Sequence, residues 1–381
     1  ETDTADRLES DLFREDEGSK PQSGWRNTAD GAPFGEKDLS LQSDTAFSYG
    51  YSQLSGDEEQ LYREILNSLI SYQEETELSV KDPEMVERVF RYVMADHPEI
   101  FYADGYEVTT YRLGTELRRI TFTGTWTLES DEVLSRRAQL EAAAALWLEG
   151  LPDGTDDFEK AKYIYDALIL RTEYEQGSAD SQTICSVLLN QRSVCQGYAK
   201  TFQYLCQLAG IPAMLVTGDV NGEGHAWNIV FLDGDWYYID PTWGDASYQR
   251  EEGEETPTLT ETVNYDYFCV TTQEIERTHS MDDNQLLPVC SAVQDQYYRH
   301  EGLYLQSADK EKIDEIFARA AQKGAPMVCF QCADDTVYQE VYRLLIEEQG
   351  IFAYLPESET TAAYLDSDRE RTFYFWFTEV S

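Results

Sequence analysis

Basic residues are scarce in this chain of 381 residues, in which 29 Lys and Arg face 73 Asp and Glu for a formal net charge of −44. Phosphate binding needs clustered positive charge, so the composition excludes a nucleic-acid partner and argues against anionic lipid. The simplest role of so much negative charge is solubility. The sequence also lacks an apolar run long enough to span a bilayer, a signal-peptide pattern and an internal repeat. Its length predicts two or three domains.

Cysteine pairs with the spacing of a metal or redox site are also missing. The seven cysteines are an odd number, so at least one thiol is free or pairs between chains. Cys329 and Cys332 form a C-x-x-C motif, but no second C-x-x-C or histidine pair accompanies it. On the strand that we predict over 326–332, positions three apart point to opposite faces of the sheet. We therefore predict neither a zinc nor a redox role for this pair.

Large aliphatic residues are few in the N-terminal 46 residues, which contain many Asp, Glu, Ser, Gly and Thr. Such a composition does not fold alone and is typical of a flexible tether. The chain begins at Glu1 rather than Met, as a trimmed mature form does. We therefore expect an acidic flexible stalk over 1–46. The protein would be extracellular or anchored to the cell surface, through this stalk or through a lipid. A cytosolic protein with a ragged N-terminus is the alternative.

Residue periodicity divides the rest of the chain into helices and strands. Ser55 and Glu58 resemble a capping box that opens a first helix. Further helices are predicted over about 83–95, 130–149, 157–171, 308–323 and 335–348. Strands are predicted over about 101–112, 117–126, 302–306, 326–332, 351–355 and 372–379, of which the first two form a hairpin. From these elements we expect an N-terminal α+β region (47–150), a central core (151–250), a connecting segment (251–298) and a small α/β C-terminal domain (299–381).

Cys195 lies at the start of a predicted helix. Ser193 and Gln196 fit a capping box with Ser193 as the N-cap, and Gly210 ends the helix. Unpaired backbone N–H groups and the positive end of the helix dipole lie in the first turn, and both favour the nucleophilic thiolate. Taken alone, Cys195 fits a small buried apolar side chain better. The residues that follow strengthen the catalytic interpretation.

His225 and Asp240 lie on two predicted strands joined by the turn residues Asp233-Gly234, a strong signal for a two-residue hairpin. In such a hairpin Trp227 faces Asp240, and His225 shares a face with Trp227. His225 and Asp240 are then diagonal neighbours, about 7–8 Å apart at the backbone, within reach of an imidazole and a carboxylate. A three-residue loop would place them on opposite faces, so the pairing depends on the turn type.

A cysteine, a histidine and an aspartate in this arrangement can act as a catalytic triad. Asp240 would accept a hydrogen bond from one ring nitrogen of His225, and the other nitrogen would exchange a proton with Cys195. The thiolate would attack a carbonyl and form a thioester, and His225 would protonate the leaving amine. Backbone N–H groups at the helix start would bind the oxyanion, and the side chain of Gln182 is a further candidate donor. The alternative for Gln182 is an ordinary surface amide.

Three stretches resemble the transglutaminase-like superfamily, a branch of the papain-like cysteine enzymes. They are Val194-Cys195-Gln196-Gly197-Tyr198-Ala199, Gly224-His225-Ala226-Trp227-Asn228 and Asp240-Pro241-Thr242-Trp243-Gly244-Asp245. They occur in family order and at family-like spacing, over roughly 157–248. The resemblance implies that Cys195 is the nucleophile, His225 the general base and acid, and Asp240 the orienting carboxylate. It also implies an α+β core in which the Cys helix packs on an antiparallel sheet, so 151–250 is expected to be the catalytic core.

Weaker matches flank this core and resemble extracellular Gram-positive members. They are Asp96-His97-Pro98-Glu99-Ile100-Phe101-Tyr102, Leu287-Pro288-Val289-Cys290 and Gln296-Tyr297-Tyr298, and we transfer no function from them. The resemblance also places aromatic residues around the cleft, which makes Trp227 and Trp243 candidates for it, Trp243 above all. Core packing is the alternative for both.

Metal ligands are not apparent. The large animal members of the superfamily need calcium, but no D-x-D-x-D-G loop is present, and Asp233-Gly234-Asp235 is better explained as a turn. His279, Cys290 and His300 lack the usual spacing of metal ligands. We therefore predict no metal and no cofactor.

The sequence thus predicts a cysteine-dependent enzyme that acts on amide bonds of a protein or peptide, cell-wall peptide among the candidates. Hydrolysis by a peptidase or amidase is slightly favoured over cross-linking, because no feature for a second substrate is visible. The alternative is a catalytically silent cell-surface binding or scaffold protein that recognises peptide or cell-wall glycan.

Overall fold

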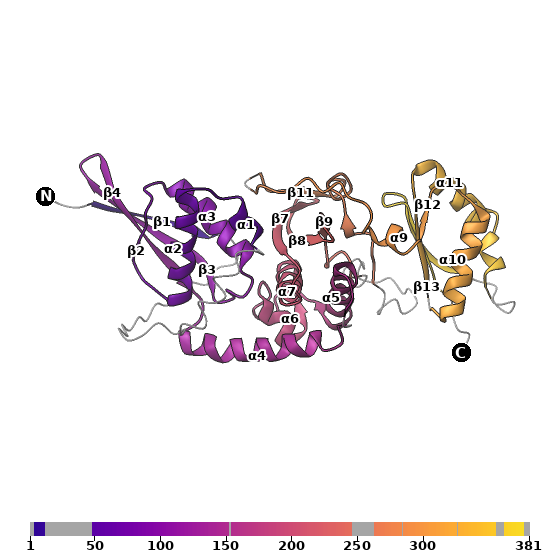
Figure 1. Ribbon diagram of the computed structural model, residues 1–381, viewed down its shortest axis with the longest axis horizontal. Coiled ribbons are helices and arrows are strands. Elements are labelled where there is room, and N and C mark those ends of the chain that lie inside the picture. Colours follow the sequence, from indigo (N-terminus) through magenta and orange to yellow (C-terminus); the bar gives the residue numbers. More distant parts are fainter. Residues whose placement is uncertain are drawn as a thin grey trace.

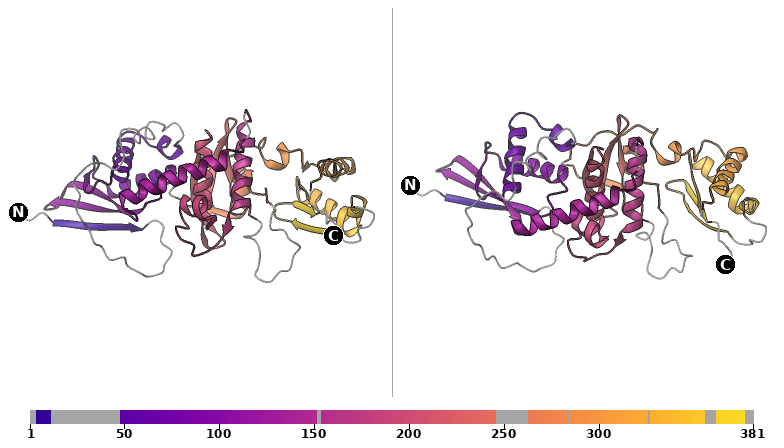
Figure 2. Two further views of the ribbon diagram at one scale, coloured as in Figure 1. Left: turned by 90° about the horizontal axis from the view of Figure 1, so that it is seen from below. Right: turned by 60° about the horizontal axis from the view of Figure 1, so that its bottom comes forward.

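The computed structural model describes residues 4–11, 48–151, 154–245, 263–283, 285–325, 327–355 and 362–376. Three units follow one another along the longest axis of the molecule, and the long helix α4 (Ser130–Leu148) runs from the first unit to the second (Figures 1 and 2). None of the helices among these residues has the combined length and apolar character needed to cross a membrane.

The N-terminal unit packs helices on one four-stranded sheet of order β1-β3-β4-β2. Its elements before α4 are β1 (Thr4–Asp11), α1 (Tyr49–Ser52), α2 (Asp57–Ser71), β2 (Thr76–Glu77), α3 (Pro83–Asp96), β3 (Ala103–Leu113) and β4 (Glu116–Trp126). The predicted hairpin is confirmed, because β3 and β4 pair antiparallel. Of the predicted capping box, the Glu58 carboxylate accepts from the Ser55 N–H at 3.3 Å, but Gly56 is the N-cap.

Part of the expected stalk forms a strand. Residues Thr4–Asp11 are β1, which pairs antiparallel with the edge of β3 from Thr4 opposite Arg112 to Asp11 opposite Gly105. A segment with too few apolar residues to fold alone can still add its backbone N–H and C=O groups to an exposed strand edge. The prediction of a tether over all of 1–46 is therefore wrong at these residues, and 12–46 lie outside the described residues.

The central unit contains a five-stranded antiparallel sheet of order β10-β9-β8-β7-β11, with helices on one side (Figure 1). Its elements are α5 (Asp157–Arg171), β5 (Glu173–Tyr174), α6 (Ile184–Asn190), β6 (Arg192–Ser193), α7 (Cys195–Leu208), β7 (Ala213–Val220), β8 (Glu223–Leu232), β9 (Asp235–Ile239), β10 (Phe268–Val270), α8 (Thr272–Ile275) and β11 (His279–Met281). The predicted Cys helix is thus present as α7, and it packs on β7 and β8.

Both edge strands of this sheet come from the segment 251–298, which the sequence suggested was only a connection. β10 pairs with β9 on one edge and β11 pairs with β7 on the other. The strands are three residues each, too short to give a clear alternating pattern, and they satisfy backbone groups that β7 and β9 would otherwise expose. The part of this segment from β10 to β11, residues 268–281, therefore belongs to the core.

The side chain of Asn228 connects α7 to the sheet through hydrogen bonds. Its side chain is buried, and its Nδ2 donates to the carbonyls of Ala199 on α7 at 3.0 Å and of Met214 on β7 at 3.3 Å. Asn228→Ala should lower the free energy of unfolding by about 1–3 kcal/mol, because buried carbonyls lose their donor. Denaturant titration beside Asn190→Ala, at an exposed helix end, measures this loss. Equal stability of the two variants would contradict it.

The C-terminal unit is a small α/β domain with a sheet of order β12-β13-β15-β14. Its elements are α9 (Tyr297–His300), β12 (Tyr304–Leu305), α10 (Lys310–Lys323), β13 (Met327–Cys332), α11 (Asp335–Tyr342), the π-helical turn Arg343–Glu347, the 3₁₀ turn Gly350–Ala353, β14 (Ala363–Ser367) and β15 (Thr372–Trp376). As predicted, Cys329 and Cys332 enter different hydrophobic clusters on the two faces of β13.

The strand predicted over 351–355 is wrong, because the chain turns there in a 3₁₀ helix that begins at Gly350. Gln349 has a left-handed φ of 59°, which breaks the extended backbone just before the apolar residues. Strand β14, which the sequence analysis missed, takes the edge beside β15 instead. Its exposed residues Tyr364 and Leu365 obscure the usual pattern of a half-buried strand.

Candidate active site

Cys195 is the first residue of α7, as predicted, but the cap differs from the prediction. Val194 is the N-cap, and the hydroxyl of Ser193 is turned back to donate to the Ser181 carbonyl at 2.8 Å. Ser193 pairs as part of β6, so its side chain serves the preceding turn and does not cap the helix. A Cβ on Gly197 would lie 1.9 Å from the Ser193 hydroxyl, so only glycine fits at position 197 in the first turn of α7.

The thiol of Cys195 differs from every other thiol of the chain in its accessibility. All seven cysteines lie in the described part of the chain, all are free, and Cys195 alone is not buried. Burial raises the pKa of each of the others: Cys185, Cys206, Cys269, Cys290, Cys329 and Cys332. These thiols stay protonated and sealed from reagents near neutral pH.

His225 and Asp240 meet as the hairpin geometry predicted. β8 and β9 pair with Leu232 opposite Asp235, the register of a two-residue turn, and both turn residues have positive φ. His225 Nε2 lies 2.8 Å from Asp240 Oδ2, and the nearby Cys195 thiol contributes to the raised pKa of His225. Because Nε2 faces the carboxylate, Nδ1 is the nitrogen left for the sulfur. The structure therefore brings all three predicted residues together.

Asp240 is held rigidly although it is fully buried. Its Oδ1 accepts from the backbone N–H groups of Thr242 at 2.9 Å and Trp243 at 3.2 Å. Burial alone would raise the pKa of this carboxyl, but His225 and His279 hold the pKa well below its usual range. Burial likewise lowers the pKa of His225, whereas the charge and hydrogen bond of Asp240 and the Cys195 thiol raise it to about 10. The site is thus arranged to hold an imidazolium beside a carboxylate.

The stability that this pair gives to the fold should depend on pH in a defined way. The contribution of His225 is complete below its ordinary pKa of 6.5 and is lost as the pH rises toward about 10. The contribution of Asp240 is complete above 3.8 and is lost as the pH falls. The wild type should therefore exceed Asp240→Asn most in unfolding free energy between pH 3.8 and 6.5. Denaturant titrations at several pH values test this, and a difference that grows above pH 6.5 would contradict it.

His279 is a member of this group that the sequence analysis missed. Its Nε2 lies 3.0 Å from the same Oδ2 of Asp240, and its side chain is fully buried. The sequence around His279 indicates no catalytic role, because nothing local shows that β11 pairs with β7 and reaches the catalytic side of the sheet. The only available signal was the small number of histidines, four in the whole chain.

The remaining predicted residues take different positions. Gln182 lies in the turn before α6, next to Ser181, whose carbonyl accepts from the Val194 N–H at 3.4 Å, so it lies near the start of the Cys helix. Trp227 is fully buried and stacks on His225, so it belongs to the core and not to an open cleft. The cleft prediction for Trp227 is wrong, because its side chain is fully buried in a hydrophobic cluster and packs edge-on against the ring of His279.

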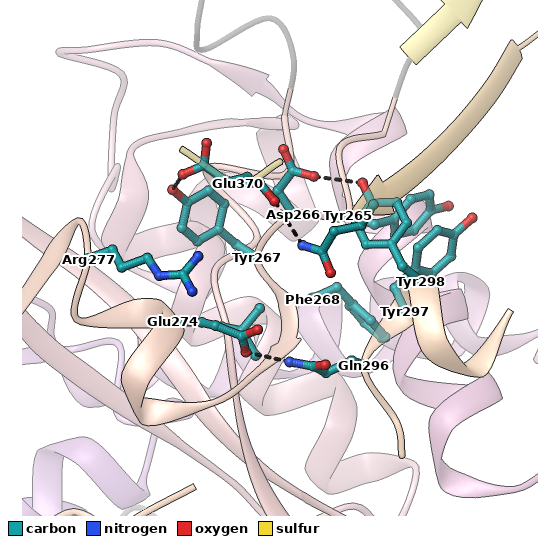
Figure 3. Close-up of a pocket in the computed structure, with 12 residues that line it drawn as sticks. Tyr265, Asp266, Tyr267, Phe268, Glu274, Arg277, Gln296, Tyr297, Tyr298 and Glu370 are labelled. Carbon is teal, nitrogen blue, oxygen red and sulfur yellow. Dashed lines mark hydrogen bonds between the residues drawn. The ribbon is translucent and has the colours of Figure 1, made fainter. Parts of the chain in front are cut away.

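Trp243 does line a cleft between the central unit and the C-terminal domain, although none of Cys195, His225 and Asp240 lines it. Its ring centroid is 6.4 Å from that of His225. The cleft has a volume of about 330 Å³ and reaches the turn between β14 and β15, and its walls include Tyr267, Leu365 and Arg369. A neighbouring pocket is lined by residues of the same two units (Figure 3). There Tyr267 donates to Glu370 at 2.8 Å across the junction.

Two groups of side chains in the described residues could hold a metal ion. The first is His225, Asp240 and His279, whose ligand atoms lie within 4.8 Å of one another. The second is the surface group of Glu159, His300 and Glu301. In the first group the distances of 2.8 and 3.0 Å between the nitrogens and the shared oxygen are those of N–H···O hydrogen bonds, which satisfy these atoms without an ion.

Comparison with known proteins places the central unit in a family. Residues 148–241 match the family described as the transglutaminase-like superfamily. Kyphoscoliosis peptidase from Homo sapiens is 33% identical over 113 residues, which are 25% of this chain and 17% of the peptidase. The Mus musculus peptidase is 32% identical over the same length. This chain therefore spans less than a fifth of the length of these relatives.

Solved structures with some similarity carry related descriptions. One is described as a TGase, with 14% identity, a TM-score of 0.28, and coverage of 42% of this chain and 48% of that chain. Another is a putative cysteine protease from Cytophaga hutchinsonii, with 19% identity, a TM-score of 0.25, and coverage of 35% and 61%. The family match and the antiparallel sheet carrying the Cys helix, rather than these scores, support the assignment. Residues 148–241 of this chain therefore form an α+β domain of the transglutaminase-like superfamily.

Proposed function

We propose that this chain is a thiol-dependent acyl-transfer enzyme that acts on amide bonds of protein or peptide substrates through Cys195, His225 and Asp240. One observation carries the proposal: the one cysteine of the chain that is not buried begins a helix and acts on the pKa of an imidazole that a fully buried carboxylate holds at 2.8 Å. Structural cysteines are usually buried and need no such partner, whereas a nucleophilic cysteine needs both access and a base.

The reaction follows from these contacts. Cys195 gives its proton to His225, and the sulfur attacks the amide carbon to form a C–S bond. The negative oxygen that develops would be stabilised by backbone N–H groups in the first turn of α7 and by Gln182. The C–N bond then breaks, and the imidazolium gives its proton to the leaving amine or ammonia. Water, activated by His225, hydrolyses the thioester, releases the acid and restores the thiol.

The substrate would lie in the cleft that starts at Trp243. Trp243, whose ring centroid lies 6.4 Å from that of His225, lines this cleft together with the β14–β15 turn of the C-terminal domain. The C-terminal domain would then contribute to substrate choice without contributing to the chemistry. Hydrolysis remains the favoured outcome over cross-linking, because the sequence shows no feature for a second amine substrate. The extracellular or cell-surface location stays a prediction.

Two parallel assays test the proposal and separate its branches. A mixture of dye-quenched peptides reports cleavage, and a fluorescent primary amine with a glutamine-containing protein reports incorporation. The wild type should release a peptide or amide product, and Cys195→Ala should release none. Cleavage without incorporation supports a peptidase or amidase, and incorporation supports a transferase. If the wild type gives neither product but binds peptide or glycan, the catalytic proposal fails in favour of a silent binding protein.

A further inference from the structure

One oxygen atom of Asp240 serves two imidazoles. Oδ2 lies 2.8 Å from Nε2 of His225 and 3.0 Å from Nε2 of His279. The side chains of Asp240 and His279 have no exposed surface, and that of His225 is 5% exposed. The proposed mechanism needs only the first of these contacts, so the second requires its own explanation.

The hydrogen-bond pattern assigns the protons. An ionised carboxylate accepts only, so the Nε2 atoms of both histidines carry hydrogen. The Oδ1 atom of Asp240 is already occupied by the two backbone N–H groups of Thr242 and Trp243. Nδ1 of His279 lies 2.7 Å from the Thr278 hydroxyl, which can donate to it. Both ring nitrogens of His279 therefore have hydrogen-bond partners in this position.

His279 is also held by packing, so its N–H direction is fixed. β11 places it opposite Val220 at the edge of the sheet. Its ring lies against three aromatic rings, with centroid distances of 4.8 Å to Trp227, 5.0 Å to Trp243 and 5.4 Å to Tyr267. Such a ring cannot swing away from Asp240 without disturbing this aromatic group. The donor is thus preorganised in a water-poor environment, where a hydrogen bond to a charge is strong.

We propose that His279 is a positioning residue of the active site, which donates to Asp240 and so keeps that carboxylate ionised and aimed at His225. The proposal rests on the proposed function, because it gives His279 a role in preparing His225 for Cys195. Without the second donor, Oδ2 keeps an unsatisfied lone pair in a buried site. The carboxylate then turns or takes up a proton, and either change weakens its hold on Nε2 of His225.

A pair of variants separates the hydrogen bond from the packing. His279→Phe keeps an aromatic ring but removes the donor, whereas the side-chain amide of Gln in His279→Gln can donate from nearly the position of Nε2. The rate of iodoacetamide reaction at Cys195 should fall roughly tenfold in His279→Phe, a typical loss for a partner one step removed from the chemistry. His279→Gln should keep most of the wild-type rate. Equal rates in His279→Phe and wild type, or equal losses in both variants, would overturn the proposal.

A measurement on the wild-type protein tests the role of His279 even if the variants do not fold. With four histidines in the chain, selective ¹⁵N labelling of their rings gives few signals. The proposal expects N–H protons at Nε2 of both His225 and His279 near neutral pH. A proton-free Nε2 on His279 would overturn it, and so would a change in these signals on adding a chelator, because a metal would then join the three groups.

The role of His279 and the proposed function can fail separately. If Cys195 of the wild type shows no preferential alkylation, the proposed function fails, whereas the ring protons of His279 still show whether the shared carboxylate exists. If Cys195 is preferentially alkylated and the reaction depends on His225 but not on the donor at 279, the function stands and the role of His279 is wrong.

Discussion

Iodoacetamide should modify Cys195 far faster than any other cysteine of the native protein near neutral pH. The other six thiols are buried with raised pKa values, whereas Cys195 is not buried and lies near His225. His225→Ala removes the group that takes the thiol proton, so the rate at Cys195 should fall by roughly a hundredfold or more. Peptide mapping by mass spectrometry after timed alkylation gives the rate at each cysteine.

His300→Ala is the matched control for this experiment. His300 is exposed and stacks on Phe158 at a centroid distance of 3.6 Å, in the chain region next to the C-terminal domain. Its loss should leave alkylation of Cys195 unchanged. Equal labelling of several cysteines in the wild type, or a rate at Cys195 that does not respond to His225→Ala, would show that this thiol is not activated.

Asp240→Asn should abolish most of the activity while keeping the fold. The Asn carbonyl oxygen can still accept from the N–H groups of Thr242 and Trp243, which hold the loop. The amide nitrogen, however, would then face Nε2 of His225 as a donor and force the ring proton to Nδ1. That tautomer cannot take a proton from Cys195, and a comparable change in a serine protease costs roughly ten-thousandfold in kcat. Turnover assays and Cys195 alkylation both measure the loss.

Asp96→Asn separates this effect from the general cost of losing a buried charge. Asp96 is also buried, accepts from the backbone N–H groups of Gly50 and Tyr51 and from the Tyr62 hydroxyl, and lies in the N-terminal unit. Its replacement should lower stability and leave the reactivity of Cys195 in the remaining folded protein unchanged. If both variants lose reactivity equally, the role of Asp240 is structural and not chemical.

The catalytic pair was predictable because one local feature fixed its geometry. The Asp233-Gly234 turn allows two residues with positive φ, and a two-residue turn determines which side chains of β8 and β9 share a face. The start of α7 was predictable for a similar reason, because apolar residues at helical spacing follow Cys195 directly. Both inferences needed only residues that are close in the sequence.

The role of His279, which the sequence analysis did not predict, depends on residues that are distant in the sequence. His279 reaches Asp240 only because β11 pairs with β7, whose partner residues Met281 and Gly218 are separated by most of the core. A strand of three residues has no periodicity that could reveal it. Ser193 failed as a cap for another reason: its hydroxyl could serve either the helix or the preceding turn, and only the pairing of β6 with β5 decides between them.

The most direct test of the catalytic unit is the reaction of the wild type with p-nitrophenyl acetate, followed by release of nitrophenolate and by intact mass. We expect a burst with one acetyl group on Cys195, then steady turnover as water releases it. Cys195→Ala should lose both phases, and His225→Ala should show a much slower acetylation of Cys195 and no steady phase. Acetylation that spares Cys195, or a wild-type protein that is acetylated there once and never turns over, would contradict the account.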